Sequence, residues 1–114
     1  MALTADQILA ADDLGLKQVA VREWNGDVYI RMMSVGERDG YERLWIGKRE
    51  TGVDNFRTEY LARVLCDEKG ELLFTREQVV TLANKSGAVM GRLFDEALKH
   101  NNMTEADVEQ LGKA

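Results

Sequence analysis

The chain has 114 residues, of which 45% are hydrophobic and 31% are charged, and its formal net charge is −5. This length and composition predict a single domain, residues 1–114, that can bury a core without disulfides. The acidic balance argues against a nucleic-acid scaffold, because phosphate binding needs a concentrated basic surface.

The first predicted element is a short helix that begins after Thr4. Thr4 and Gln7 have the spacing of a capping box, in which each side chain accepts a hydrogen bond from the other residue's backbone N–H. We expect the helix to run to about Asp13. Its apolar residues are Ile8, Leu9 and Ala11.

An antiparallel hairpin over about 17–33 follows. Two runs of alternating apolar residues flank Asn25-Gly26, the pair that best tolerates the positive φ angles of a two-residue turn. With these residues as the loop, Val21 pairs with Ile30 on an apolar face that helices must cover. The other face carries Arg22, Trp24, Tyr29 and Arg31.

Helices account for most of the remaining chain. Further capping boxes begin at Ser34, Thr75 and Thr104, and Ser86 is placed to cap a longer helix. The expected helices span about 35–48, 55–66, 76–84, 86–101 and 105–111. The helix over 55–66 has the strongest apolar stripe, so we expect it to be central and to cover the hairpin.

The predicted fold class is therefore α+β and mainly helical. One N-terminal antiparallel hairpin, about 17–33, packs against five or six helices. Between the helices, residues 71–74 are predicted to form an extended segment that pairs briefly and returns the chain to the core.

Nothing in the sequence has the spacing typical of a catalytic, metal or cofactor site. His100 lies near a helix end and is expected to be solvated. Cys66 ends an apolar helix, where a small core residue is more usual than a nucleophile. We therefore expect a protein that is not an enzyme and holds no cofactor. One cysteine, no signal peptide and no transmembrane run indicate a reducing cytoplasm and no membrane contact.

Val79 to Leu98 has the helix, break and helix spacing of a helix-turn-helix. Its second helix offers one cation, Arg92, and no Asn, Gln or Lys for base edges before Lys99. A helical hairpin in the core explains the pattern better. A small DNA-binding regulator that uses this segment is the alternative function.

The aromatic residues divide into a core set and a surface set. Trp45, Phe56, Tyr60 and Phe94 fit the core. Trp24 and Tyr29 fall on the outer hairpin face, which is either covered by a helix or open as a partner surface. The candidate partner-binding residues are Trp24, Tyr29, Arg31, Trp45 and Ile46.

The order of elements resembles the tail assembly chaperones of long-tailed bacteriophages. Two segments carry most of the resemblance. They are the Ser34-x-x-Glu37-Arg38 helix entry and the Asp67-Glu-x-Gly70-x-x-Leu73-Phe74 turn. The similarity covers nearly the whole chain, and at 114 residues the chain looks like the short, non-frameshifted form.

The resemblance implies a chaperone without catalysis. Such proteins bind the tape measure protein, keep it soluble and help recruit the major tail protein. They act in the host bacterial cytoplasm and are absent from the mature virion. From the residues themselves we also expect self-association, through the hairpin edge or the Trp45–Asp54 region, because of the aromatic Trp24 and Tyr29 face and the glycine-flanked loop.

Overall fold

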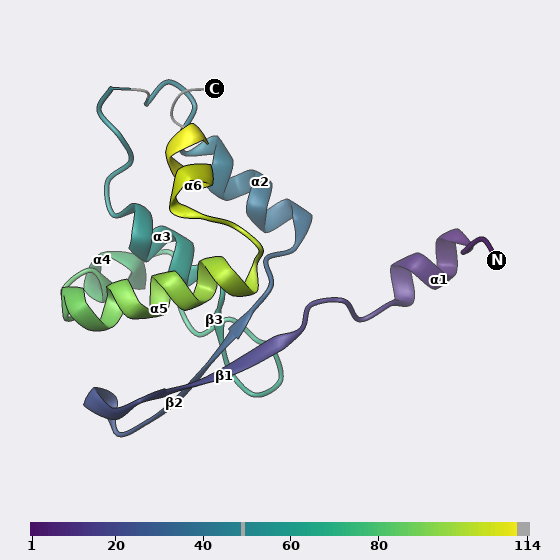
Figure 1. Ribbon diagram of the computed structural model, residues 1–114, viewed down its shortest axis with the longest axis horizontal. Helices are drawn as coiled ribbons and strands as arrows, with labels where there is room; N and C mark the ends of the chain where they lie inside the picture. The colour runs from purple at the N-terminus through teal and green to yellow at the C-terminus, as the bar shows by residue number, and fades with distance from the viewer. Residues whose placement is uncertain (49, 112–114) are drawn as a thin grey trace.

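A computed structural model describes residues 1–48 and 50–111. In this part of the chain, a three-stranded antiparallel sheet of order β1-β2-β3 lies beside a group of helices (Figure 1). The strands are β1 (Leu16–Val21), β2 (Gly26–Arg31) and β3 (Leu65–Cys66); the helices are α1 (Ala5–Ala10), α2 (Val35–Arg43), α3 (Phe56–Ala62), α4 (Gln78–Leu82), α5 (Gly87–His100) and α6 (Glu105–Leu111). The predicted α+β class is confirmed.

The helix starts follow the predicted caps with one exception. Thr4 and Ser34 each form a complete capping box, and the Ser86 hydroxyl accepts a hydrogen bond from the Val89 N–H. Thr104 and Asp107 also bond reciprocally, at 2.9 and 3.1 Å. The box at Thr75 is half formed. The Gln78 side chain accepts a hydrogen bond from the Thr75 N–H, but α4 begins only at Gln78.

The predicted two-residue hairpin loop is wrong. The loop contains four residues, a 3₁₀ turn η1 (Arg22–Trp24) followed by Asn25, and Gly26 pairs with Val21. Only Asn25 takes a positive φ, 55°, because a four-residue loop built on such a turn needs one left-handed residue rather than two. This places Trp24 in the loop instead of on the outer sheet face.

The strand register is therefore shifted. The partner of Val21 is Gly26 rather than Ile30, and Val19 pairs with Val28. Because the shift is an even number of residues, each side chain keeps its predicted face. Val21 and Ile30 are both fully buried, as the apolar face requires.

The helix that covers this face is α5, not the predicted helix over 55–66. α5 contacts β2 on one side and α3 on the other (Figure 1). The predicted central helix ends at Ala62, since Leu65 and Cys66 leave it to pair with β2 as a third strand. The segment after the turn then bridges Cys66 through Leu72, which matches the predicted brief pairing.

Three residues at successive turns of α5 hold β1 and its loop. Arg92 makes two hydrogen bonds to the Glu23 carboxylate, at 2.9 and 3.0 Å. Glu96 pairs with Lys17, and His100 Nε2 donates to the Gly15 carbonyl oxygen at 2.7 Å. His100 is therefore half-buried and bonded, rather than solvated as predicted.

Five aromatic rings form a closed cycle in the core. Each ring meets its two neighbours edge to face, with centroids 5.1 to 6.4 Å apart, an arrangement favoured by the ring quadrupoles. In order, the cycle is Tyr41, Trp45, Phe56, Phe94 and Tyr60. It joins α2, α3 and α5, and it confirms the predicted core role of the four aromatic residues.

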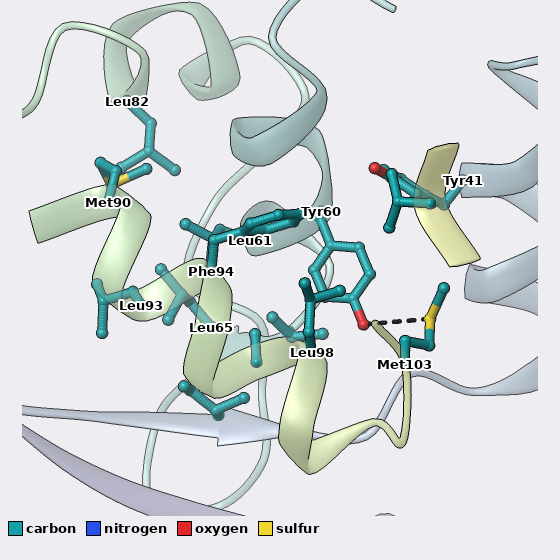
Figure 2. Packing of buried hydrophobic residues seen from close by; sticks show 14 of the residues in the cluster. Tyr41, Tyr60, Leu61, Leu65, Leu82, Met90, Leu93, Phe94, Leu98 and Met103 are labelled. Atoms are coloured by element: carbon teal, nitrogen blue, oxygen red, sulfur yellow. Dashed lines mark hydrogen bonds between the residues drawn. The ribbon is translucent and has the colours of Figure 1, made fainter. Parts of the chain in front are cut away.

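Both tyrosine hydroxyls in the cycle have partners. Tyr60 donates to the Met103 sulfur at 3.4 Å, which ties the segment before α6 to the core (Figure 2). Tyr41 donates to the Phe56 carbonyl oxygen at 3.3 Å. Burial raises the pKa of Tyr41 to about 12, so this hydroxyl remains a donor over the whole physiological range.

A carboxylate also links α3 to the segment before α4. Glu59 accepts from Arg63 at 2.8 Å and from Arg76 at 2.7 Å. Burial raises the pKa of Glu59, but hydrogen bonds from Arg76 and Arg63 outweigh it, so the net pKa is lowered. Hydrogen bonds from Arg92 lower the pKa of Glu23 to about 2.

These carboxylates predict a loss of stability in acid. A carboxyl whose pKa is lower in the folded chain than its unfolded value of about 4.3 stabilises the fold above that pH. The contribution is then lost as pH falls through the folded value. We expect the free energy of unfolding in urea to decrease between about pH 4.5 and 2. In Glu59→Gln the decrease should be shallower; an unchanged pH profile would contradict the role given to Glu59.

Candidate partner-binding surfaces

The five residues singled out in the sequence do not form one patch. Trp24 lies at the hairpin tip and is 37% exposed, whereas Ile46 follows α2 and is 76% exposed. The hairpin tip and the end of α2 lie at opposite sides of the molecule (Figure 1). Trp45 is buried in the aromatic cycle.

The other two residues lie on β2 and are half-buried. Arg31 pairs with Glu37 of α2 and donates to the Gly70 carbonyl oxygen at 3.0 Å. Tyr29 lies on the outer sheet face, where its carbonyl oxygen accepts from the Cys66 thiol. Arg31 thus links β2 to α2 and to the turn after β3, so its side chain makes contacts within the chain.

The described helices leave the outer hairpin face open, and its exposed part carries both polar and apolar residues. Gln18 and Ala20 on this face are exposed. The Gln18 amide donates to the Asp27 carboxylate at 2.7 Å. Leu16, which pairs with Arg31 on this face, is 40% exposed, so the apolar side chains Leu16 and Ala20 lie on either side of Gln18.

An apolar groove lies between the end of α3 and the start of α4, and we name it the α4 groove. Its volume is about 350 Å³. Its apolar lining is Ala62, Leu72, Phe74 and Val79, and its polar lining is Glu37, Arg63, Thr75 and Arg76. Leu72 is 39% exposed and its neighbour Leu73 is 45% exposed, so apolar surface extends out of the groove.

A second groove, the α5 groove, lies between the start of α3 and the first half of α5. Its volume is about 620 Å³. The apolar lining includes Phe56, Ala83 and Met90, and the charged lining is Arg57, Lys85 and Asp95. Gly87 and Gly91 also line it, and a Cβ at either position would have open space around it.

Sequence reasoning missed both grooves. Each is built from segments far apart in the chain, so no single run of residues marks it. The adjacent leucines after the turn, Leu72 and Leu73, were the one signal available for the α4 groove, because an extended segment points successive side chains to opposite faces and can leave one of two such residues outside the core.

The described residues offer little for chemistry. No group of three or more His, Cys, Asp or Glu side chains among them is placed to hold a metal ion. Burial raises the pKa of the Cys66 thiol, which disfavours the nucleophilic thiolate. No helix in this part of the chain is both long and apolar enough to cross a membrane.

The segment with helix-turn-helix spacing belongs to the core. α5 buries its apolar side against α3 and the sheet, and its one early cation, Arg92, is bound to Glu23. The exposed side of α5 also carries the carboxylate of Asp95, and Glu96 nearby is paired with Lys17 of β1. A recognition helix needs free donors there, so the arrangement favours packing over base contact.

Comparison with known proteins identifies the family. A family model described as phage tail assembly chaperone matches residues 7–111. The chain belongs to this family of phage tail assembly chaperones. The match includes both grooves, the aromatic cycle and all of the sheet.

A solved structure agrees with the family assignment in its fold. The tail assembly chaperone of bacteriophage HK97 is similar over 87% of this chain and 94% of its own, with a TM-score of 0.62 and 24% identity. No curated protein is significantly similar to the chain in sequence. This chaperone family member therefore shares the architecture of the HK97 protein, while its surfaces have to be judged from its own residues.

Proposed function

We propose that this chaperone family member binds apolar helices of the tape measure protein, keeps that protein soluble and helps recruit the major tail protein. The observation that carries the proposal is the family match over residues 7–111. The chain is proposed to act without catalysis, in the host bacterial cytoplasm, and to be absent from the mature virion. It is also proposed to self-associate.

The α4 groove is the best candidate for the client contact. An amphipathic helix binds by laying its apolar stripe into an apolar groove. The floor of the α4 groove is apolar, and the charged side chains Glu37 and Arg76 at its sides are paired within the chain, so apolar contacts would supply the binding. Trp24 and Ile46, both exposed, are proposed as additional contacts.

The size and charge of the chain suit such a role. One groove of this size binds a single helix weakly, but many copies along a long client bind strongly. A net charge of −5 on every copy keeps the coated client dispersed.

Co-purification tests the proposal. A tape measure fragment expressed with the tagged chain should be recovered as a soluble complex, whereas the fragment expressed alone should be insoluble. The purified chain should not retard phage or host DNA in a gel. Salt-sensitive DNA retardation that Arg92→Ala abolishes, with no recovery of the fragment, would replace the proposal with the DNA-binding alternative.

A further inference from the structure

Helix α1 does not pack against any other segment within residues 1–48 and 50–111. All six of its residues are exposed, and it projects from one end of the molecule (Figure 1). Leu3, Ile8 and Leu9 are 69%, 58% and 84% exposed. Ala5, Ile8 and Leu9 fall on one side of the helix, because they are three and four residues apart.

An isolated helix of this length is not stable in water. Helices shorter than about 12 residues are marginal alone, even in favourable sequences. The capping box of Thr4 and Gln7 contributes only about 1 kcal/mol. The exposed apolar stripe and the complete cap together indicate a helix that is stabilised on another surface.

The geometry points to the α5 groove of a second copy as that surface, and we propose that α1 docks there. This inference rests on the self-association in the proposed function and assigns it to α1 and the α5 groove instead of the hairpin edge or the Trp45–Asp54 region. Each copy then docks its own α1 on one neighbour and binds the α1 of another neighbour in its α5 groove.

Charge favours this pairing. Residues 1–14 contain Asp6, Asp12 and Asp13 and no lysine or arginine. The α5 groove carries two exposed cations, Arg57 and Lys85, and a single carboxylate. The α4 groove suits an acidic helix less well, because its cations Arg63 and Arg76 are already paired with Glu59.

The shape of the α5 groove also favours docking of α1 from a second copy. A helix can approach α5 closely at Gly87 and Gly91, where no side chain stands in the way. Phe56 is half-buried at this groove, and the Arg57 guanidinium lies over its ring, 4.6 Å from the centroid, so an apolar surface and a cation stand side by side there. Docked there, Ile8 and Leu9 would exchange water for apolar contacts.

The position of the groove favours a second copy over the same chain. The chain enters β1 at Gly15, which is bonded to His100 at the end of α5. The groove lies along the first half of α5, on a side roughly 140° around the helix axis from the residues that hold β1. The four residues 11–14 span at most about 14 Å, so the chain's own α1 would have to bend sharply around α5.

Two variants and their mixture test the proposal by sedimentation velocity at several concentrations. Ile8→Asp damages α1, and Gly91→Leu fills the groove. Each should weaken self-association at least tenfold relative to the unmodified chain. Val35→Asp and Gly40→Leu are the matched controls, because Val35 is also exposed and a Cβ at Gly40 also has open space; both should associate normally.

The mixture gives the sharpest result. In an equimolar mixture, the intact α1 of the Gly91→Leu chain fits the intact groove of the Ile8→Asp chain, so a 1:1 dimer forms and grows no further. A mixture that stays monomeric, or single variants that associate like the unmodified chain, would overturn the inference. An unmodified chain that stays monomeric would also overturn it. This holds even if α1 is protected from hydrogen exchange, because such protection in a monomer would mean that α1 docks on its own chain.

Failure of this inference can be told apart from failure of the proposed function. Sedimentation of the chain alone reports only on α1 and the α5 groove. Solubility of a tape measure fragment reports on the client contact, which we place at the α4 groove.

Discussion

Replacing Phe94 with alanine should lower the free energy of unfolding by about 3–5 kcal/mol. Phe94 is 1% exposed and closes the aromatic cycle between Phe56 and Tyr60, with centroids 5.9 and 5.4 Å away. Its loss opens a cavity between α3 and α5 and removes two edge-to-face contacts. The melting temperature should fall by roughly 15 °C or more, measured by circular dichroism.

Val80→Ala is the control for this substitution. Val80 lies on α4 and is 68% exposed, so its truncation should change the free energy of unfolding by less than about 0.5 kcal/mol. A Phe94→Ala chain as stable as the Val80→Ala chain would show that the aromatic cycle does not hold α3 against α5.

Leu72→Asp should weaken binding of a tape measure fragment at least tenfold while the chain stays folded. Leu72 lines the α4 groove and is 39% exposed, so the new carboxylate reaches water in the free chain. A docked apolar helix would bury that carboxylate without a partner, which costs more than about 1.4 kcal/mol, the equivalent of tenfold in affinity. Calorimetric titration measures the effect.

Val35→Asp is the matched control for Leu72→Asp. It introduces the same charge at an apolar residue that is 80% exposed and does not line the α4 groove. Its affinity for the fragment should match that of the unmodified chain. Equal losses in both variants would indicate a general charge effect and would move the client contact away from the α4 groove.

The sequence patterns that predicted the fold correctly were local. Capping boxes at Thr4, Ser34 and Thr104 need only residues three apart, and all three form. Alternation assigned the faces of the hairpin correctly even though its register was wrong, because an even shift preserves the face.

The errors came from tertiary contacts. Asn25-Gly26 allows a two-residue loop, but the chain uses a 3₁₀ turn and places Gly26 in β2. The apolar stripe at 55–66 was interpreted as one helix, yet Leu65 and Cys66 pair with β2. A short apolar run is compatible with a buried helix and with a buried strand, so the pattern alone does not distinguish the two.

The candidate surfaces could be predicted even less well. Exposure of Trp24 and Ile46 depends on where their loops turn, whereas Trp45 is buried, as its assignment to the aromatic core predicted. The α4 groove combines residues from four segments, whose meeting only the fold determines. The role in tail assembly came instead from the resemblance carried by Ser34–Arg38 and Asp67–Phe74, which the family match confirms at the level of the family.

Light scattering of a purified tape measure fragment tests the central claim most directly. The fragment is diluted from denaturant into buffer, alone or with an equimolar or greater amount of the chain. Aggregation should be suppressed in proportion to the amount of chain added, and Leu72→Asp should suppress it less. A fragment that precipitates equally fast with and without the chain would contradict the account.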